Sequence, residues 1–283
     1  MRQMAITRDL GALVAAGVAA GVAAGAAAGI AIGVAAGISA LAPGPARAQD
    51  AAAQANNPIA DTQAVSFQNL YAGELTGINR DANQFYFRYA LPFRAMGAQW
   101  LMRATLPVNS FPDAGGGTTT GIGDLNILAA YTFDTGNPAV SFGIGPQFTL
   151  PTASDDAVGA EKWQAGLANV LFNATDPTFQ WGYLLTWQAS FAGDDDRDYV
   201  SLGAFQPFLF YQLGQGWYLR STGVWTYNFA SDAYSIPVGL GFGKVVKSER
   251  AVVNAFVEPQ YSVATHGDGQ PEWGAFAGLN FQF

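Results

Sequence analysis

The sequence predicts an all-β fold: a closed antiparallel up-and-down transmembrane β-barrel of about twelve strands, which follows an N-terminal signal sequence. Three observations support this: a weakly apolar leader, a series of long segments that alternate with a period of two, and connectors that alternate between short and long. Only 12% of the 283 residues are charged, while 50% are hydrophobic and 34 residues are glycine. This composition suits strands whose two faces meet different solvents.

The leader has the order of an export signal. Arg2 and Arg8 precede an uncharged stretch over 10–46, and Ala46-Arg47-Ala48 has the small-x-small form of a cleavage site. A retained anchor is the alternative, because glycine recurs every fourth residue from Gly17 to Gly37 and the stretch is long enough to span a bilayer. We therefore expect a cleaved signal peptide over 1–48, an irregular N-terminal segment over 49–64 and a barrel over 65–283.

Twelve segments of the remaining chain alternate in character. The clearest is TFQWGYLLTWQASF, in which Phe179, Trp181 and Trp187 lie on one face and small polar residues lie mostly on the other. Strands of soluble sandwiches average about 5–6 residues, whereas a tilted membrane-spanning strand needs about 9–11, which favours the barrel over a sandwich. The expected strands are 65–73, 83–93, 98–108, 122–133, 138–151, 161–173, 178–191, 199–213, 217–228, 234–246, 251–263 and 272–283.

The connectors indicate where this barrel resides. Short connectors (94–97, 134–137, 174–177, 214–216 and 247–250) alternate with longer ones (74–82, 109–121, 152–160, 192–198, 229–233 and 264–271). Barrels of the bacterial outer membrane have short turns at one end and longer loops at the other, and aromatic residues near their strand ends. We therefore expect export through the periplasm to the outer membrane, with the lipids of that membrane around the barrel.

The last segment, WGAFAGLNFQF, places Phe281 and Phe283 on one face, with Phe276 as an exception to the alternation. If this strand closes against the first one, lipid surrounds both aromatic side chains. A terminal phenylalanine is typical of outer-membrane proteins and is recognised by their assembly machinery. We therefore interpret Phe281 and Phe283 as an assembly signal.

Several motifs occur in the order found in one family of bacterial outer-membrane proteins. They include FRYALPF, GIGDLNILAAYTF, AEKWQAGLANV, FQPFLFYQLGQGWYL and YSIPVGLGFGKVVK, and they extend over about residues 60–283. The chain resembles the meta-pathway phenol-degradation family, whose members are often called transporters and sometimes carry the label neuromedin U. The resemblance implies a monomeric barrel of about twelve strands that passes small, in some cases aromatic, compounds.

The candidate functional residues lie on the face opposite the aromatic one. If RAMG (94–97) forms the first short loop, Arg88 lies directly opposite Arg103. Two like charges in that position are destabilising, so we expect Glu258 or Asp124 to reach across the lumen to them, or an anionic solute to bind between them. The alternative is a salt-bridge cluster that only fills the lumen. The candidates for lining or selectivity are Arg88, Arg103, Asp124, Gln206 and Glu258.

Composition restricts the remaining functions. The net charge of −8 argues against a nucleic-acid partner, and the absence of cysteine excludes thiolate metal sites, so we expect no metal and no cofactor. The single histidine, His266, lies in a glycine-rich stretch that we interpret as a loop, and we expect no enzyme.

We expect a channel that passes small, hydrophobic or aromatic solutes through a narrow, partly filled lumen. The alternative is a non-conducting structural or surface-binding barrel. The inward aromatic residues that suit such a solute are Tyr86, Phe208, Phe210 and Phe256.

Overall fold

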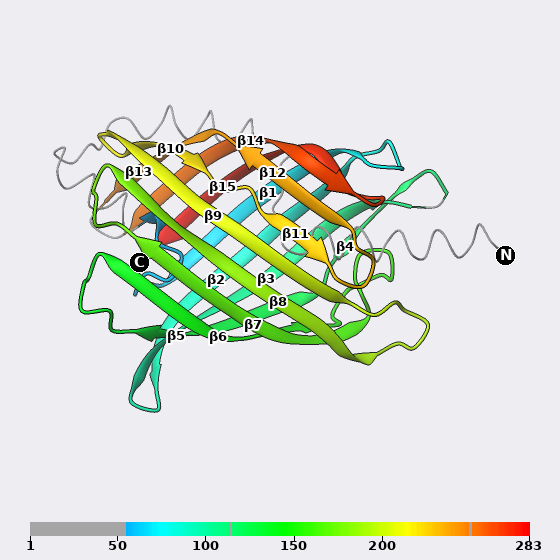
Figure 1. Cartoon of the computed structure of the whole chain (residues 1–283), viewed down its shortest axis with the longest axis horizontal. Helices are drawn as coiled ribbons and strands as arrows, with labels where there is room; N and C mark the ends of the chain where they lie inside the picture. The colour runs from blue at the N-terminus through cyan, green and yellow to red at the C-terminus, as the bar shows by residue number, and fades with distance from the viewer. Residues whose placement is uncertain (1–54, 114, 249–250) are drawn as a thin grey trace.

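The computed structural model describes residues 55–113, 115–248 and 251–283 and shows a closed antiparallel β-barrel (Figure 1). The first strand, β1 (Ala64–Leu75), pairs with the last strand, β15 (Pro271–Gln282), so the sheet closes on itself as predicted. Within the described ranges, no helix is long and apolar enough to cross a bilayer. The predicted signal peptide over 1–48 and the first residues of the segment 49–64 lie outside the described residues.

Fifteen strand segments form twelve strands, which confirms the predicted fold. The other bounds are β2 (Ala82–Ala95), β3 (Ala98–Pro112), β4 (Thr118–Ile122), β5 (Leu125–Phe133), β6 (Val140–Leu150), β7 (Lys162–Asn173), β8 (Phe179–Gly193), β9 (Ser201–Gly214), β10 (Trp217–Ser221), β11 (Trp225–Asn228), β12 (Tyr234–Gly239), β13 (Gly241–Lys247) and β14 (Val252–His266). Three strands are interrupted. β4 and β5 both pair with β3, β10 and β11 both pair with β9, and β12 and β13 both pair with β14.

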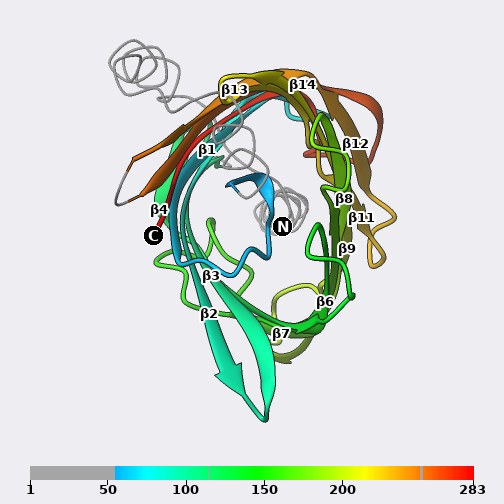
Figure 2. The same cartoon turned by 90° about the vertical axis from the view of Figure 1, so that its left-hand side faces the viewer.

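The two ends of the barrel differ. The start of β1, the end of β15 and the short turns share one end, which we call the inner end. The longer connectors, including 151–161 and 194–200, lie at the opposite, outer end. The view along the barrel shows a ring of strands with the first described residues, coloured blue, inside it (Figure 2). This arrangement matches the alternation of short and long connectors in the sequence.

Aromatic side chains cover the outside of the barrel near both ends. Near the inner end, Trp100 lies between Phe93 and Tyr131, with ring centroids 6.4 Å and 5.6 Å away. Near the outer end, Tyr234 stacks between Tyr227 and His266, at 6.3 Å and 5.7 Å. His266 is the last residue of β14 and not part of a loop, so that detail of the sequence interpretation was wrong. Such belts are typical of the interfaces of a membrane.

The register of the β2–β3 hairpin corrects another prediction. Ala95 pairs with Ala98, so the turn consists of only Met96 and Gly97, both with positive φ (54° and 75°). A two-residue turn in which both residues have positive φ matches the twist of its strands, whereas a type I or II turn would splay them. Consequently Arg88 lies opposite Thr105 and Arg103 lies opposite Ala90. The two arginines share the inward face but are diagonal neighbours and not a directly opposed pair.

Candidate solute pathway

Three cavities follow one another through the interior of the barrel. An outer cavity has about 600 Å³ of empty space, a middle one about 640 Å³ and an inner one about 870 Å³, counting their open mouths. The outer and middle cavities share Thr105, Asn126, Gln188 and Leu202. The middle and inner cavities share Arg88, Arg103 and Gln206. Because neighbouring cavities share walls, they lie end to end, and three of the predicted candidates line one junction.

Arg88 and Arg103 line this junction without a carboxylate. Arg88 Nη1 donates a hydrogen bond of 2.6 Å to Gln68 Oε1, and its guanidinium carbon lies 4.9 Å from the centre of the Tyr86 ring. The Nε atoms of both arginines are buried without a hydrogen-bond partner. Among the described residues that line the middle and inner cavities, there is no aspartate or glutamate. The junction is therefore a cationic part of the lumen.

Glu258 does not reach Arg88 or Arg103, contrary to one of the alternatives predicted. Its side chain is fully buried and forms an ion pair with Arg220, whose Nε donates to Glu258 Oε2 at 2.7 Å. The Arg220 guanidinium also lies over the Phe256 ring, 3.6 Å from its centre. A buried carboxylate held by a cation in this way is not free to neutralise a second cation.

Sequence reasoning missed Arg220. The alternation of the strand could have identified it, because Arg220 lies on the opposite face from the outward-facing Trp217 and Leu219 of the motif GWYL. The same inward cluster contains Phe276, the exception in the final strand, whose ring centre is 4.6 Å from that of Phe256. Phe276 is 3% exposed, so its break in the alternation places an aromatic residue inside the barrel.

The interruption between β10 and β11 exposes backbone groups, and two predicted residues satisfy them from the lumen. Thr222 N–H donates to Glu258 Oε1 at 2.8 Å, and Gln206 Nε2 donates to the Thr222 carbonyl at 3.1 Å. Gly239 provides the space for this contact, because a Cβ at that position would lie 2.6 Å from Glu258 Oε1. Unpaired backbone groups are costly inside a membrane, so these contacts stabilise the broken strand.

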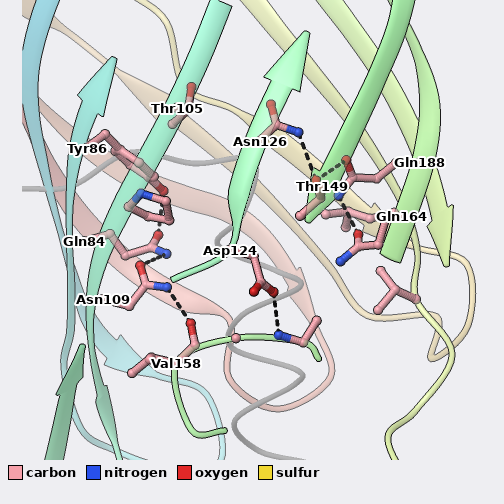
Figure 3. A pocket seen from close by; sticks show the side chains of 15 residues that line it. Gln84, Tyr86, Thr105, Asn109, Asp124, Asn126, Thr149, Val158, Gln164 and Gln188 are labelled. Atoms are coloured by element: carbon pink, nitrogen blue, oxygen red, sulfur yellow. Dashed lines mark hydrogen bonds between the residues drawn. The ribbon is translucent and has the colours of Figure 1, made fainter. Parts of the chain in front are cut away.

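Asp124 holds a loop of the outer end inside the mouth of the barrel (Figure 3). Its Oδ1 accepts a hydrogen bond from Ala153 N–H at 3.1 Å and its Oδ2 accepts one from Ala160 N–H at 2.7 Å, so both partners belong to the connector 151–161. Asn109 Nδ2 donates to the Val158 carbonyl at 2.8 Å, and Val158 is fully buried. The prediction that Asp124 reaches the arginines was therefore wrong, because the backbone of a loop occupies this carboxylate.

Residues 55–63 cross the lumen at the inner end (Figure 2). Asn254 Nδ2 donates to Asn56 Oδ1 at 3.1 Å, and Gln282 Nε2 donates to the Ala55 carbonyl at 3.4 Å. On another part of the wall, Asn57 Nδ2 donates to Ser141 Oγ at 2.9 Å. β14, β15 and β6 thus hold this segment. The described part of the 49–64 segment partly fills the lumen below the arginines.

Together these features define a twelve-stranded β-barrel of the outer-membrane type with cavities along its axis. It is similar to the crystal structure of the COG4313 outer membrane channel from Pseudomonas putida F1, with a TM-score of 0.58 and 13% sequence identity over 78% of this chain and 94% of that chain. It is also similar to the NanC porin, with a TM-score of 0.51 and 8% identity over 78% of this chain and 100% of that chain. At these identities the likeness establishes the fold.

Comparisons of the sequence with known proteins do not assign the chain to a family. No family model matches the chain, and no curated protein matches it. The resemblance to the phenol-degradation family therefore remains a prediction from the quoted motifs.

Proposed function

We propose that this protein is a channel of the bacterial outer membrane that passes small solutes through a narrow, partly filled lumen. The observation that supports this is the series of three cavities that share walls from the outer mouth to the inner end. A barrel that served only as a structural element would gain stability from a fully packed interior. The two similar structures described above are an outer membrane channel and a porin, which agrees with this proposal.

The lining of the cavities favours small apolar or aromatic solutes. Tyr86 lines the outer cavity, and Phe208, Phe210 and Phe256 line the inner one. Uncharged amides and hydroxyls, together with Arg88 and Arg103, form most of the remaining wall, so these rings provide most of the apolar surface that a solute can contact. The loop 151–161 and the segment 55–63 narrow the two ends, which favours solutes smaller than those of a general porin.

Reconstitution tests the channel proposal. In planar bilayers the purified barrel should give small discrete conductance steps, and liposomes that contain it should take up phenol faster than glucose. Thr105→Trp places an indole where the outer and middle cavities meet and should abolish the steps. Leu185→Trp, on the lipid-facing side where Leu185 is 48% exposed, is the matched control and should conduct normally. Absence of steps and uptake in the wild-type protein would instead support a non-conducting barrel.

We also propose that Phe281 and Phe283 guide assembly into the outer membrane. Phe281 lies on the outside, where its ring centre is 6.4 Å from that of Phe67, and Phe283 is 64% exposed. Both are therefore accessible to an assembly factor before lipid covers them. Phe283→Ala should lower the amount of heat-modifiable, folded barrel in the outer membrane. Phe93→Ala, which removes another outward ring near the inner end, should leave that amount unchanged.

A further inference from the structure

We infer that Arg88 and Arg103 form a binding site for a small organic carboxylate with an apolar body. The site lies where the middle and inner cavities meet, halfway along the lumen. This inference rests on the proposed channel function, because it names a class of solute for that pathway.

The charge of the cavities is the first reason. Arg88, Arg103 and Arg220 line the inner cavity, and of these only Arg220 contacts a carboxylate among the described residues. The carboxylates of Glu258 and Asp124 are occupied by Arg220 and by the backbone of a loop. Cations surrounded by protein and membrane are costly unless an anion pairs with them. The junction is therefore a place where an anionic solute is favoured over a neutral one.

The unused donors are the second reason. Each guanidinium carries five N–H donors in a planar fork that fits the two oxygens of a carboxylate. The Nε donors of Arg88 and Arg103 are buried and have no hydrogen-bond partner. Gln206, which lines the same two cavities, adds a side-chain amide to this wall. A bound carboxylate would supply the acceptors that the protein does not.

The apolar wall beside the arginines is the third reason. Phe208, Phe210, Phe256 and Phe276 line the inner cavity. Arg88 already lies against the ring of Tyr86. A ligand whose carboxylate meets the arginines would thus place its body against aromatic rings, where burial of apolar surface is favourable. Inorganic anions lack such a body, so an aromatic or aliphatic carboxylate suits the site better.

Binding of benzoate to the detergent-solubilised barrel tests the inference directly. Isothermal titration calorimetry should detect benzoate binding to the wild-type protein, and binding of its neutral analogue benzyl alcohol should be at least about tenfold weaker. The double variant Arg88→Gln/Arg103→Gln should bind benzoate at least about tenfold more weakly. Arg94→Gln makes the same substitution at an exposed position near the inner end of β2, outside the three cavities, and should bind like wild type. Heat-modifiable migration in gels shows that each variant is folded.

The outcomes separate this inference from the channel proposal, because calorimetry does not need conduction. Benzoate binding without conductance would contradict the channel and leave the site intact. Conductance with equal affinity for benzoate in the wild type and the double variant would overturn the site and leave the channel intact. Equal affinities of the wild type for benzoate and benzyl alcohol would likewise overturn it. Arg88→Lys/Arg103→Lys keeps both charges without the planar fork and should recover only part of the affinity if the carboxylate binds in the bidentate way.

Discussion

Two arginine sites inside one barrel differ chiefly in the presence of an acid. Arg220 lies against fully buried Glu258, and three aromatic rings surround its guanidinium. Arg88 and Arg103 face the same inner cavity, where Arg88 donates to the side-chain amide oxygen of Gln68 and neither arginine forms an ion pair in the described part of the chain. All three arginines sit on inward positions of their strands.

The difference separates a structural role from a functional one. Glu258 is occupied by four hydrogen bonds, so the ion pair stabilises the broken wall at Thr222 and offers little to a solute. The two other arginines form no ion pair in the described part of the chain and leave donors unused, so their charge is available to a solute. A cation in a lumen therefore indicates selectivity only after its partner has been identified.

Removal of the acid from the paired site should have the largest effect. Glu258→Gln leaves Arg220 buried without a counter-charge, and loss of one partner of a buried pair costs about 3–5 kcal/mol. Urea-induced unfolding of the barrel in lipid vesicles should show this loss. The control is Glu161→Gln, which removes the partly exposed ion pair with Arg197 (3.3 Å) and should cost at most about 1 kcal/mol. Equal losses in the two variants would mean that the buried pair has no special role.

Asp124 offers an intermediate test, since it is a carboxylate held by backbone N–H groups instead of by a cation. Asp124→Asn weakens two charge-assisted hydrogen bonds to the loop 151–161, at a cost of about 1–3 kcal/mol. The loop should then become more sensitive to protease, and single-channel conductance should rise as the mouth widens. Asp155→Asn, an exposed change within the loop itself, should alter neither property. A wild-type conductance in Asp124→Asn would show that the loop does not limit flow.

The unpaired arginines should matter little for stability and much for selectivity. In Arg88→Gln/Arg103→Gln the barrel should be at least as stable as the wild type, because no buried ion pair is broken and two charges without a counter-charge are removed. The reversal potential in a salt gradient should shift away from anion preference. Arg94→Gln should leave both quantities unchanged. A large loss of stability would place these two arginines in the same structural class as Arg220.

The strands and their inward faces could be predicted from the sequence because alternation is a local property of the chain. The twelve predicted segments coincide with the twelve strands, and Arg88, Arg103 and Gln206 fall on the lumen as expected. The acid partners could not be predicted in this way. Glu258 of β14 meets Arg220 of β10 and Thr222 in the interruption after it, and Asp124 meets a loop that folds back into the barrel, so both contacts depend on three-dimensional proximity.

The register of β2 and β3 was the other feature that the sequence analysis predicted wrongly, and it leads to the smallest predicted effect. Met96 adopts φ 54° in a two-residue turn, where asparagine followed by glycine is the usual choice, so the sequence did not reveal the turn. Met96→Asn relieves the left-handed conformation and should stabilise the hairpin by less than about 1 kcal/mol, measured by urea unfolding. Because the substitution favours the observed turn, it should leave the diagonal placement of Arg88 and Arg103, and hence benzoate affinity, unchanged. Gly97→Val, which puts a β-branched residue at φ 75°, should destabilise the same turn. If Met96→Asn were destabilising, the two-residue turn and the diagonal register derived from it would be incorrect.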